Sequence, residues 1–291
     1  MGGKASSFLI LFAAMLWGTT GTTQALAPET AHPISIGAVR LAVGGLFLLI
    51  LVLVTGKLSL RDWPIKAIVG ASFCMALYQP LFFSAVSSTG VAIGTVVAIG
   101  SAPILSGLIE WAYLNTRPTR IWWFSTGISI IGCLLLFADK ESVSADPVGI
   151  LLALGAGLSF ASYTLISRGI AGDHSSLSLV AIVFTLSAIF LSPFLLIYDL
   201  SWIRSVRGVV ASLQLGIVAT GAAYLLFAKG LSNVSPSTAV TFALAEPMTA
   251  ALLGFLVLEE SLNITAWTGI FLLVIGIGIL IWSPKNEKMT A

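Results

Sequence analysis

The chain has 291 residues, of which 57% are hydrophobic and only 9% are charged. Soluble domains carry about 25% charged residues, so this composition excludes an ordinary soluble domain. The net charge of +2 is too small to indicate a nucleic-acid partner. The apolar residues occur in runs of about 20, the length that crosses a hydrocarbon core of about 30 Å. They predict an all-α membrane protein.

Ten such runs follow one another, separated by short connections with helix-breaking residues such as Pro28, Pro118 and Pro147. The first run resembles a secretory signal peptide, but its Trp17-Gly18 pair and four nearby threonines are polar for one. We therefore expect this run to be retained as the first transmembrane helix. The expected spans are 7–27, 33–55, 64–86, 91–114, 120–138, 147–168, 176–198, 208–230, 236–258 and 265–282.

The distribution of Lys and Arg predicts the orientation, because cytoplasmic loops carry an excess of these residues. If the N-terminus is cytoplasmic, ten of the 14 residues lie on the cytoplasmic side and three lie on the other side. The remaining one, Arg40, falls within the second span. We expect both termini in the cytoplasm, which agrees with an even number of spans. The cytoplasmic set is Lys4, Lys57, Arg61, Lys66, Arg117, Arg120, Arg168, Lys229, Lys285 and Lys288, and the opposite set is Lys140, Arg204 and Arg207.

The second half of the chain repeats the first at an offset of 143–144 residues. Residues 147–282 laid over 4–138 bring Ala102-Pro103 onto Glu246-Pro247 and Trp17 onto Phe160. Further matches are Phe83 with Phe227, Trp123 with Trp267, Gly132 with Gly276, and Ser35 with Ser178. Five spans in each half make the second copy enter the membrane inverted. We expect two inverted five-helix repeats, residues 1–140 and 141–291, which is a recurrent plan of transporters.

A family resemblance rests on this layout and on short motifs of the last two spans. The motifs are Ala245-Glu246-Pro247-Met248, then Gly254-Phe255-Leu256-Val257-Leu258-Glu259, and finally Trp267-Thr268-Gly269 and Gly276-Ile277-Gly278. The chain resembles the drug/metabolite transporter superfamily, EamA type, and most of all its bacterial amino-acid exporters, including the aromatic group. The resemblance implies a secondary transporter with spans 1–4 and 6–9 around a central pathway. The first repeat departs from the pattern, since Ala102 replaces the carboxylate before proline and Asn115 stands opposite Glu259.

A carboxylate and a proline, Glu246 and Pro247, stand side by side in the middle of the ninth span. An ionised carboxylate at the bilayer centre costs about 2.5–3.5 kcal/mol even on the mildest scale. Polar groups and broken helices are tolerated at this depth where they line a cavity, so Glu246 is the first candidate for the substrate site. It can bind an ammonium group, carry a proton that drives antiport, or serve only packing as a buried protonated acid.

Other polar and aromatic side chains at mid-span depth complete the predicted substrate site. They line a cavity or serve ordinary helix packing, two readings that the sequence leaves open. The candidates beside Glu246 are Trp17, Tyr78, Gln79, Ser101, Tyr163 and Tyr224. Arg40 is either an anchor that reaches the outer interface or a cavity group that meets a substrate carboxylate. For Glu110 we expect an interfacial ion pair with Arg117 or Arg120.

Three residues of the fourth and ninth spans, Gly100, Pro103 and Pro247, are hinge candidates. Small residues also let membrane helices approach one another, so packing is the alternative reading. A proline within a helix removes the donor for the carbonyl four residues earlier. The carbonyl groups of Ile99 and Ala243 are therefore candidates for ligand contacts.

No enzyme signature occurs along the chain. The two histidines, His32 and His174, fall in loops on opposite sides, and no Gly-x-Ser-x-Gly nucleophile motif is present. We expect no catalysis, no metal and no cofactor. A phosphate-binding Gly-x-x-x-x-Gly-Lys-Ser/Thr loop is absent too, which excludes ATP hydrolysis by this chain.

These patterns together predict a secondary transporter of the cell inner membrane, a monomer or homodimer whose partners are the lipid bilayer and a small-molecule substrate. The family resemblance implies that it exports small metabolites, above all amino acids and among them aromatic ones, and we expect alternating access around a midplane cavity. The alternative is a broad exporter of drugs or cations with the same fold. Against this alternative, small multidrug pumps of the superfamily use a glutamate in the first span, which this chain lacks.

Overall fold

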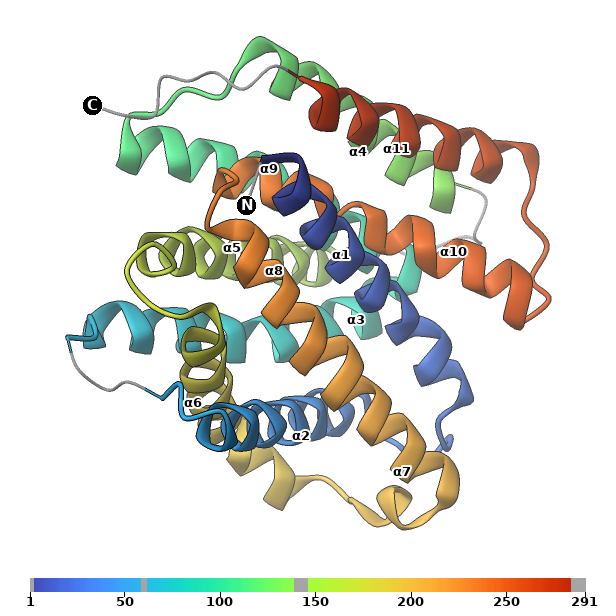
Figure 1. The fold of residues 1–291 in the computed structure, drawn as a ribbon. Helices are drawn as coiled ribbons and strands as arrows, with labels where there is room; N and C mark the ends of the chain where they lie inside the picture. Colours follow the sequence, from blue (N-terminus) through green and yellow to red (C-terminus); the bar gives the residue numbers. More distant parts are fainter. Residues whose placement is uncertain (1–2, 59–61, 139–145, 284–291) are drawn as a thin grey trace.

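The structure, a computed structural model, describes residues 3–58, 62–138 and 146–283 (Figure 1). The described residues form helices and loops and contain no strand. Ten helical segments among them are long and apolar enough to cross a bilayer, which confirms the predicted all-α, ten-span membrane protein. Four residues used in the charge count, Arg61, Lys140, Lys285 and Lys288, lie outside the described residues.

The first half contains four continuous helices for its five spans. They are α1 (Gly3–Leu26), α2 (Pro33–Val54), α3 (Ile65–Leu114) and α4 (Arg120–Phe137). α3 holds two spans, because the backbone turns at Gly90, whose φ is 84°. Glycine adopts this left-handed conformation at no steric cost. The third span therefore runs from Ile65 to Gly90, past its predicted end at residue 86.

The second half is less regular, since two of its five spans are interrupted. Its helices are α5 (Pro147–Ile170), α6 (Ser176–Ile197), the 3₁₀-helix η1 (Ser201–Arg204), α7 (Val206–Leu213), the π-helix η2 (Gln214–Ala222), α8 (Ala223–Leu231), α9 (Pro236–Phe242), α10 (Ala245–Val257) and α11 (Ile264–Trp282). The eighth span is thus α7, η2 and α8 in series, and the ninth is α9 and α10. π-Helical segments inside helices frequently mark functional sites.

Several helices begin at a capping side chain that precedes a proline. Asp146 accepts hydrogen bonds from the N–H groups of Val148 (3.1 Å) and Gly149 (3.3 Å) at the start of α5. Ser235 caps α9 in the same position before Pro236. The cap satisfies backbone donors that have no partner inside the helix, and proline fits the first helical position. This local chemistry explains why the predicted starts at residues 147 and 236 agree with the structure.

Helices from the two halves pack against each other through most of the bundle. α3 packs chiefly on α5, α2 on α6, and α1 on α8 and α10. α4 and α11 lie along one edge, where Figure 1 shows them side by side. Gly132 and Gly269 let these two helices meet closely, since a Cβ on Gly132 would lie 2.7 Å from the carbonyl oxygen of Gly269. The remaining eight spans surround the middle of the bundle, where the candidate site lies.

Candidate functional site

A cavity lies between the two five-helix halves and receives side chains from both. Its lining residues are Trp17, Arg40, Tyr78, Ala98, Ile99, Ala102, Phe160, Tyr224, Val240, Ala243 and Glu246. The cavity has a volume of about 30 Å³. This is room for about one water molecule, so a small-molecule substrate fits there only after the surrounding helices move apart.

The inverted repeat explains why the cavity forms where it does. Ala102 and Glu246 occupy equivalent positions of the two repeats, each directly before a proline, and both line the cavity. Trp17 and Phe160, the other equivalent pair, also lie on its wall. The inversion therefore brings corresponding positions of the two halves together in one space. It places a carboxylate on one side of this space and a methyl group on the other.

Glu246 reaches the cavity from the start of α10, directly after the break in the ninth span. α9 ends at Phe242 and α10 begins at Ala245, so the break lies in the turn before Pro247, as expected from the clash of a proline with the preceding turn. The carbonyl oxygen of Ala243 accepts a hydrogen bond from the N–H of Glu246 at 2.9 Å. The expectation that proline leaves this carbonyl free is therefore wrong. Within the part of the chain that the structure describes, no hydrogen bond engages the Glu246 carboxylate.

Arg40 is held inside the bundle by the π-helix. Its side chain is 8% exposed, its Nε donates to the hydroxyl of Thr220 at 2.8 Å, and its Nη2 donates to the carbonyl of Ala219 at 3.2 Å. Thr220 in turn donates to the carbonyl of Leu215, five residues earlier, at 2.8 Å. These contacts exclude the reading of Arg40 as an anchor at the outer interface. Its Nη1 has no hydrogen-bond partner among the described residues and remains available on the cavity side.

Arg40 and Glu246 bring opposite charges to the same cavity wall from different halves. The arginine attracts the carboxylate electrostatically, yet no ion pair within 4.0 Å joins them in the described part of the chain. An uncompensated charge inside a membrane protein is costly, and such charges mark ligand or ion pathways. The cavity therefore contains one acidic and one basic side chain that do not form an ion pair with each other in the described part of the chain.

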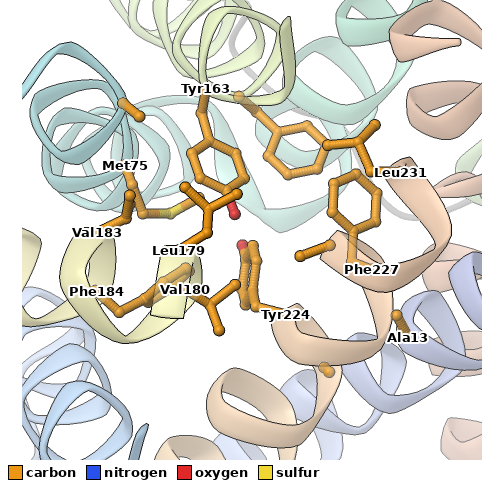
Figure 2. Close-up of a cluster of buried hydrophobic side chains, with 14 of the residues drawn as sticks. Ala13, Met75, Tyr163, Leu179, Val180, Val183, Phe184, Tyr224, Phe227 and Leu231 are labelled. Atoms are coloured by element: carbon orange, nitrogen blue, oxygen red, sulfur yellow. The ribbon is translucent and has the colours of Figure 1, made fainter. Parts of the chain in front are cut away.

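An aromatic cluster forms the adjoining wall. The ring of Trp17 lies 4.7 Å from Tyr224, 5.2 Å from Phe227 and 5.8 Å from Phe160, measured between ring centroids. Figure 2 shows Tyr224 and Phe227 within this cluster, and the hydroxyl groups of Tyr163 and Tyr224 point toward one another. Trp17 is 3% exposed, and its indole Nε1 has no hydrogen-bond partner. A buried indole N–H usually finds a partner, so this donor is available to an acceptor that enters the cavity.

Five of the predicted substrate residues line the cavity, namely Trp17, Arg40, Tyr78, Tyr224 and Glu246, and three do not. Gln79 is buried, with its amide oxygen 3.3 Å from the position of a Cβ on Gly37. Ser101 donates to the carbonyl of Ala98 at 3.3 Å and faces Gly157 of α5. Tyr163 lies behind the wall, with its ring 5.9 Å from that of Tyr224. In this conformation these three side chains lie outside the cavity lining, and their role in substrate binding stays a prediction.

The hinge candidates differ between the halves. α3 continues through Gly100 and Pro103 and departs from helical backbone angles only at Gly90. The second half instead breaks directly before Pro247. A Cβ on Gly100 would meet no atom within 4 Å, so this glycine is not needed for close packing. In the observed conformation the ninth span carries the break, whereas the fourth does not.

Glu110 does not form the predicted interfacial pair with Arg117 or Arg120. Its side chain is 3% exposed, and its Oε2 accepts a hydrogen bond from the backbone N–H of Ser237 at 3.0 Å. Arg117 instead lies over the ring of Trp111, 5.2 Å from the centroid. The prediction failed because it considered only neighbours in sequence, whereas the true partner is 127 residues away.

Some functional features were not predicted from the sequence. Phe160 lines the cavity, and the repeat alignment with Trp17 was a signal that could have identified it. Thr220 and the π-helix that hold Arg40 have no clear signal in the sequence. Gly18 was also overlooked, although a Cβ there would lie 2.8 Å from the carbonyl oxygen of Glu246. This glycine lets α1 lie against the start of α10.

Comparison with known proteins agrees with this architecture. A solved crystal structure that covers 94% of this chain, and is itself covered over 96%, superposes with a TM-score of 0.82 at 20% sequence identity. At this identity the likeness shows the shared fold alone. "Uncharacterized transporter YwfM" of Bacillus subtilis is 49% identical over 288 residues, or 99% of this chain and 97% of that protein. "Uncharacterized inner membrane transporter YicL" of Salmonella typhimurium is 23% identical over 97% of both chains.

The family assignment covers both halves of the chain. The EamA-like transporter family matches residues 4–138 and again residues 147–282. The two matched segments are the two halves that face each other across the cavity. The chain therefore belongs to the EamA-like transporter family.

Proposed function

We propose that this transporter exports amino acids, including aromatic ones, across the cell inner membrane by alternating access. One observation carries the proposal: Glu246, Arg40 and Trp17 line one cavity, and each has a polar group without a hydrogen-bond partner there. The carboxylate is an acceptor with negative charge, the guanidinium is a donor with positive charge, and the indole N–H is a neutral donor. A ligand that satisfies all three carries an anionic and a cationic group.

An α-amino acid has these two groups on one carbon. In our proposal its carboxylate binds Nη1 of Arg40 and the indole N–H of Trp17, and its ammonium group binds Glu246. The zwitterion compensates both buried charges at once, which neither an anion nor a cation alone can do. Arginine suits the first role, because its planar guanidinium forms directed hydrogen bonds with carboxylates.

The aromatic wall favours an apolar or aromatic substrate side chain. Phe160, Tyr224 and Trp17 present ring faces and edges to the cavity, and their neighbours are further rings rather than polar groups. Offset and edge-to-face ring pairs contribute about 0.5–1.5 kcal/mol beyond burial of the apolar area. A phenylalanine side chain placed here gains this term, whereas a threonine side chain does not.

Transport in this scheme follows from the inverted halves, which rock about the cavity so that it opens first to the cytoplasm and then to the outside. The charge distribution supports cytoplasmic termini, and the proposal takes the sides of the membrane from it. Glu246 also supplies a route to proton coupling, since a proton and a substrate ammonium group compete for the same carboxylate. If each substrate molecule leaves in exchange for a proton, a proton gradient directed into the cell drives efflux. Without this exchange the protein facilitates efflux down the substrate's own gradient.

An export of organic cations is the second candidate, and the rings around Glu246 favour it. Cations bind the faces of aromatic rings, and a carboxylate adds charge compensation. Arg40 works against this candidate, because it places a permanent positive charge in the same cavity. The two candidates therefore predict opposite effects of a positive charge on the substrate.

Efflux from proteoliposomes separates them. The vesicles are loaded with radiolabelled phenylalanine, threonine or a cationic dye, with and without a pH gradient. Two derivatives, phenylalaninamide and N-acetylphenylalanine, remove the negative and the positive charge of the substrate in turn. The variant is Glu246→Gln, and the matched control is Glu29→Ala, which removes an exposed carboxylate in the loop after α1.

Efflux of phenylalanine, with neither derivative transported, is the result that we expect. The loss of this efflux in Glu246→Gln but not in Glu29→Ala assigns the ammonium group to Glu246. A gradient response that disappears in Glu246→Gln makes the same residue the coupling group. Efflux of the dye and of phenylalaninamide without phenylalanine efflux contradicts the proposal and favours the cation exporter.

A further inference from the structure

The ninth span is packed very differently on the two sides of its break. In α9 every residue except Thr238 is buried, whereas in α10 only Ala245, Pro247 and Gly254 are. α9 packs against α3 and α5, and α10 packs chiefly against α1. The bundle is therefore closed around the cavity at the end where α9 begins, and is more loosely packed at the end where α10 finishes. We call these the α9 end and the α10 end.

Glu110 makes a direct contact at the α9 end. Its carboxylate accepts the N–H of Ser237, the second residue of α9, at 3.0 Å, and the side chain is almost fully buried. The N–H groups of the first helical turn have no partners inside the helix, so this bond replaces water. Hydrogen bonds to ionised groups are about twice as strong as neutral ones. The bond joins the last two turns of α3 to the start of α9.

Two further contacts support the same interface. The hydroxyl groups of Thr126 in α4 and Thr241 in α9 lie 3.1 Å apart and are both buried. Arg168, in the last turn of α5, attracts the Glu110 carboxylate, and its Nε is buried without a hydrogen-bond partner. α3, α4 and α5 thus all hold α9 at this end.

The inverted repeat shows that this contact has no counterpart at the α10 end. At the repeat offset of 144, Glu110 corresponds to Gly254 and Ser237 corresponds to Ile93. Glycine has no side chain that can reach an N–H group on the facing helix. The residues equivalent to Glu110 and Ser237 therefore cannot form this hydrogen bond, although the two halves share their fold.

We propose that Glu110 is a positioning residue of the transport cycle, a latch that closes the cavity at the α9 end and must release Ser237 before that end opens. The geometry shows what release would uncover, because Val240 and Ala243 follow Ser237 at intervals of one helical turn and line the cavity. Glu110 acts through α9 and does not touch the cavity itself. As a role in transport the latch rests on the proposed function, but its effect on the cavity does not.

Thiol labelling without substrate tests the latch. The reporter is Val240→Cys in a background with Cys74→Ala and Cys133→Ala, and the probe is a membrane-impermeant maleimide added to one side of oriented vesicles. A separate Asn233→Cys variant, exposed in the loop before α9, identifies which side is the α9 end. The latch variants are Glu110→Ala and Glu110→Gln, and Glu29→Ala is the matched control.

Labelling from the α9 end should become about tenfold faster or more in Glu110→Ala. This factor corresponds to the free energy lost when a hydrogen bond to an ionised group is removed from the closed state. From the α10 end the same cysteine should label more slowly, because the two open states exclude each other. Glu110→Gln keeps a neutral acceptor and should show a smaller change in the same directions. If Glu110→Ala does not fold, Glu110→Gln alone tests the latch. In this variant labelling should become faster from the α9 end and slower from the α10 end.

Two results overturn the latch. One is labelling from the α9 end at the parental rate in both Glu110 variants. The other is faster labelling from both ends, which indicates a generally loosened bundle rather than a shift between two closed ends. A shift in labelling together with no amino-acid efflux leaves the latch standing and refutes only the proposed substrate.

Discussion

Gly18 sets the distance between α1 and the start of α10, and its replacement by alanine should displace Glu246. A Cβ on Gly18 would lie 2.5 Å from Cβ of Thr249 and 2.8 Å from the carbonyl oxygen of Glu246. Carbon atoms in favourable contact lie about 3.5–4.0 Å apart, so one helix must shift by about 1 Å. Overpacking of this kind costs about 1–3 kcal/mol of stability.

The shift has a functional consequence, because one of the obstructing atoms belongs to the backbone of Glu246 itself. Moving this backbone changes the separation between the carboxylate and Arg40, which together fit the two charges of an amino acid. We expect a higher half-saturation concentration for phenylalanine efflux in Gly18→Ala. A loss of about 1.4 kcal/mol in substrate binding corresponds to a tenfold rise.

Gly132→Ala is a matched control for the steric effect. A Cβ on Gly132 would lie 2.7 Å from the carbonyl oxygen of Gly269, in the interface of α4 and α11 and away from the cavity lining. Thermal unfolding of both variants at one scan rate should show similar decreases, since unfolding of such proteins is often irreversible. Efflux should change only in Gly18→Ala. Unaltered half-saturation in a folded Gly18→Ala protein would refute the reasoning that this contact positions Glu246.

The other predictions concern the groups that hold and complete the charge pair. Arg40→Lys keeps the charge but loses the Nε donor to Thr220, and we expect about tenfold weaker phenylalanine binding, measured by half-saturation of efflux. Thr220→Val removes the acceptor at nearly constant volume and should weaken binding less. The double variant should show less than the sum of the two effects, and additive effects would show that Thr220 does not act through Arg40. Trp17→Phe keeps a ring but removes the indole N–H, so unlabelled phenylalanine should compete less well with radiolabelled phenylalanine for efflux. Equal competition in the variant and the native protein would show that Trp17 does not bind the substrate carboxylate.

The ten spans and the inverted repeat followed from the sequence, because run length and proline position are local properties of the chain. The position of Glu246 beside a helix break could be predicted for the same reason, since Pro247 constrains the turn before it. The turn at Gly90 could not be placed, because the apolar pattern continues past residue 86 and only the backbone conformation shows where the helix ends.

The partners of the two buried charged residues were beyond local reasoning. Arg40 binds Thr220 at a separation of 180 residues, and Glu110 binds Ser237 at a separation of 127 residues. Sequence neighbours suggested an interfacial ion pair for Glu110, whereas tertiary packing places this carboxylate inside the bundle. The π-helix around Thr220 has no local signal either. The Thr220 hydroxyl donates to the carbonyl of Leu215 and accepts from Nε of Arg40, which is 180 residues away in the sequence.

The two repeats share a backbone fold but have diverged in charge. As a result, the cavity receives its acidic residue from one half and its basic residue from the other. Glu246 comes from the second half, while its equivalent in the first half is Ala102; Arg40 comes from the first half and has Val183 as its equivalent at the offset of 143. A symmetric pair of carboxylates would suit a divalent cation or two protons, whereas one acid and one base on opposite halves suit a single zwitterion bound in one orientation. The same reasoning applies to Glu110 and Gly254, where one half has a carboxylate and the other has a glycine at the equivalent position. In our proposals, inversion supplies two similar ends of the cavity, and substitutions in single repeats decide which end is held closed and which end of the substrate each half binds.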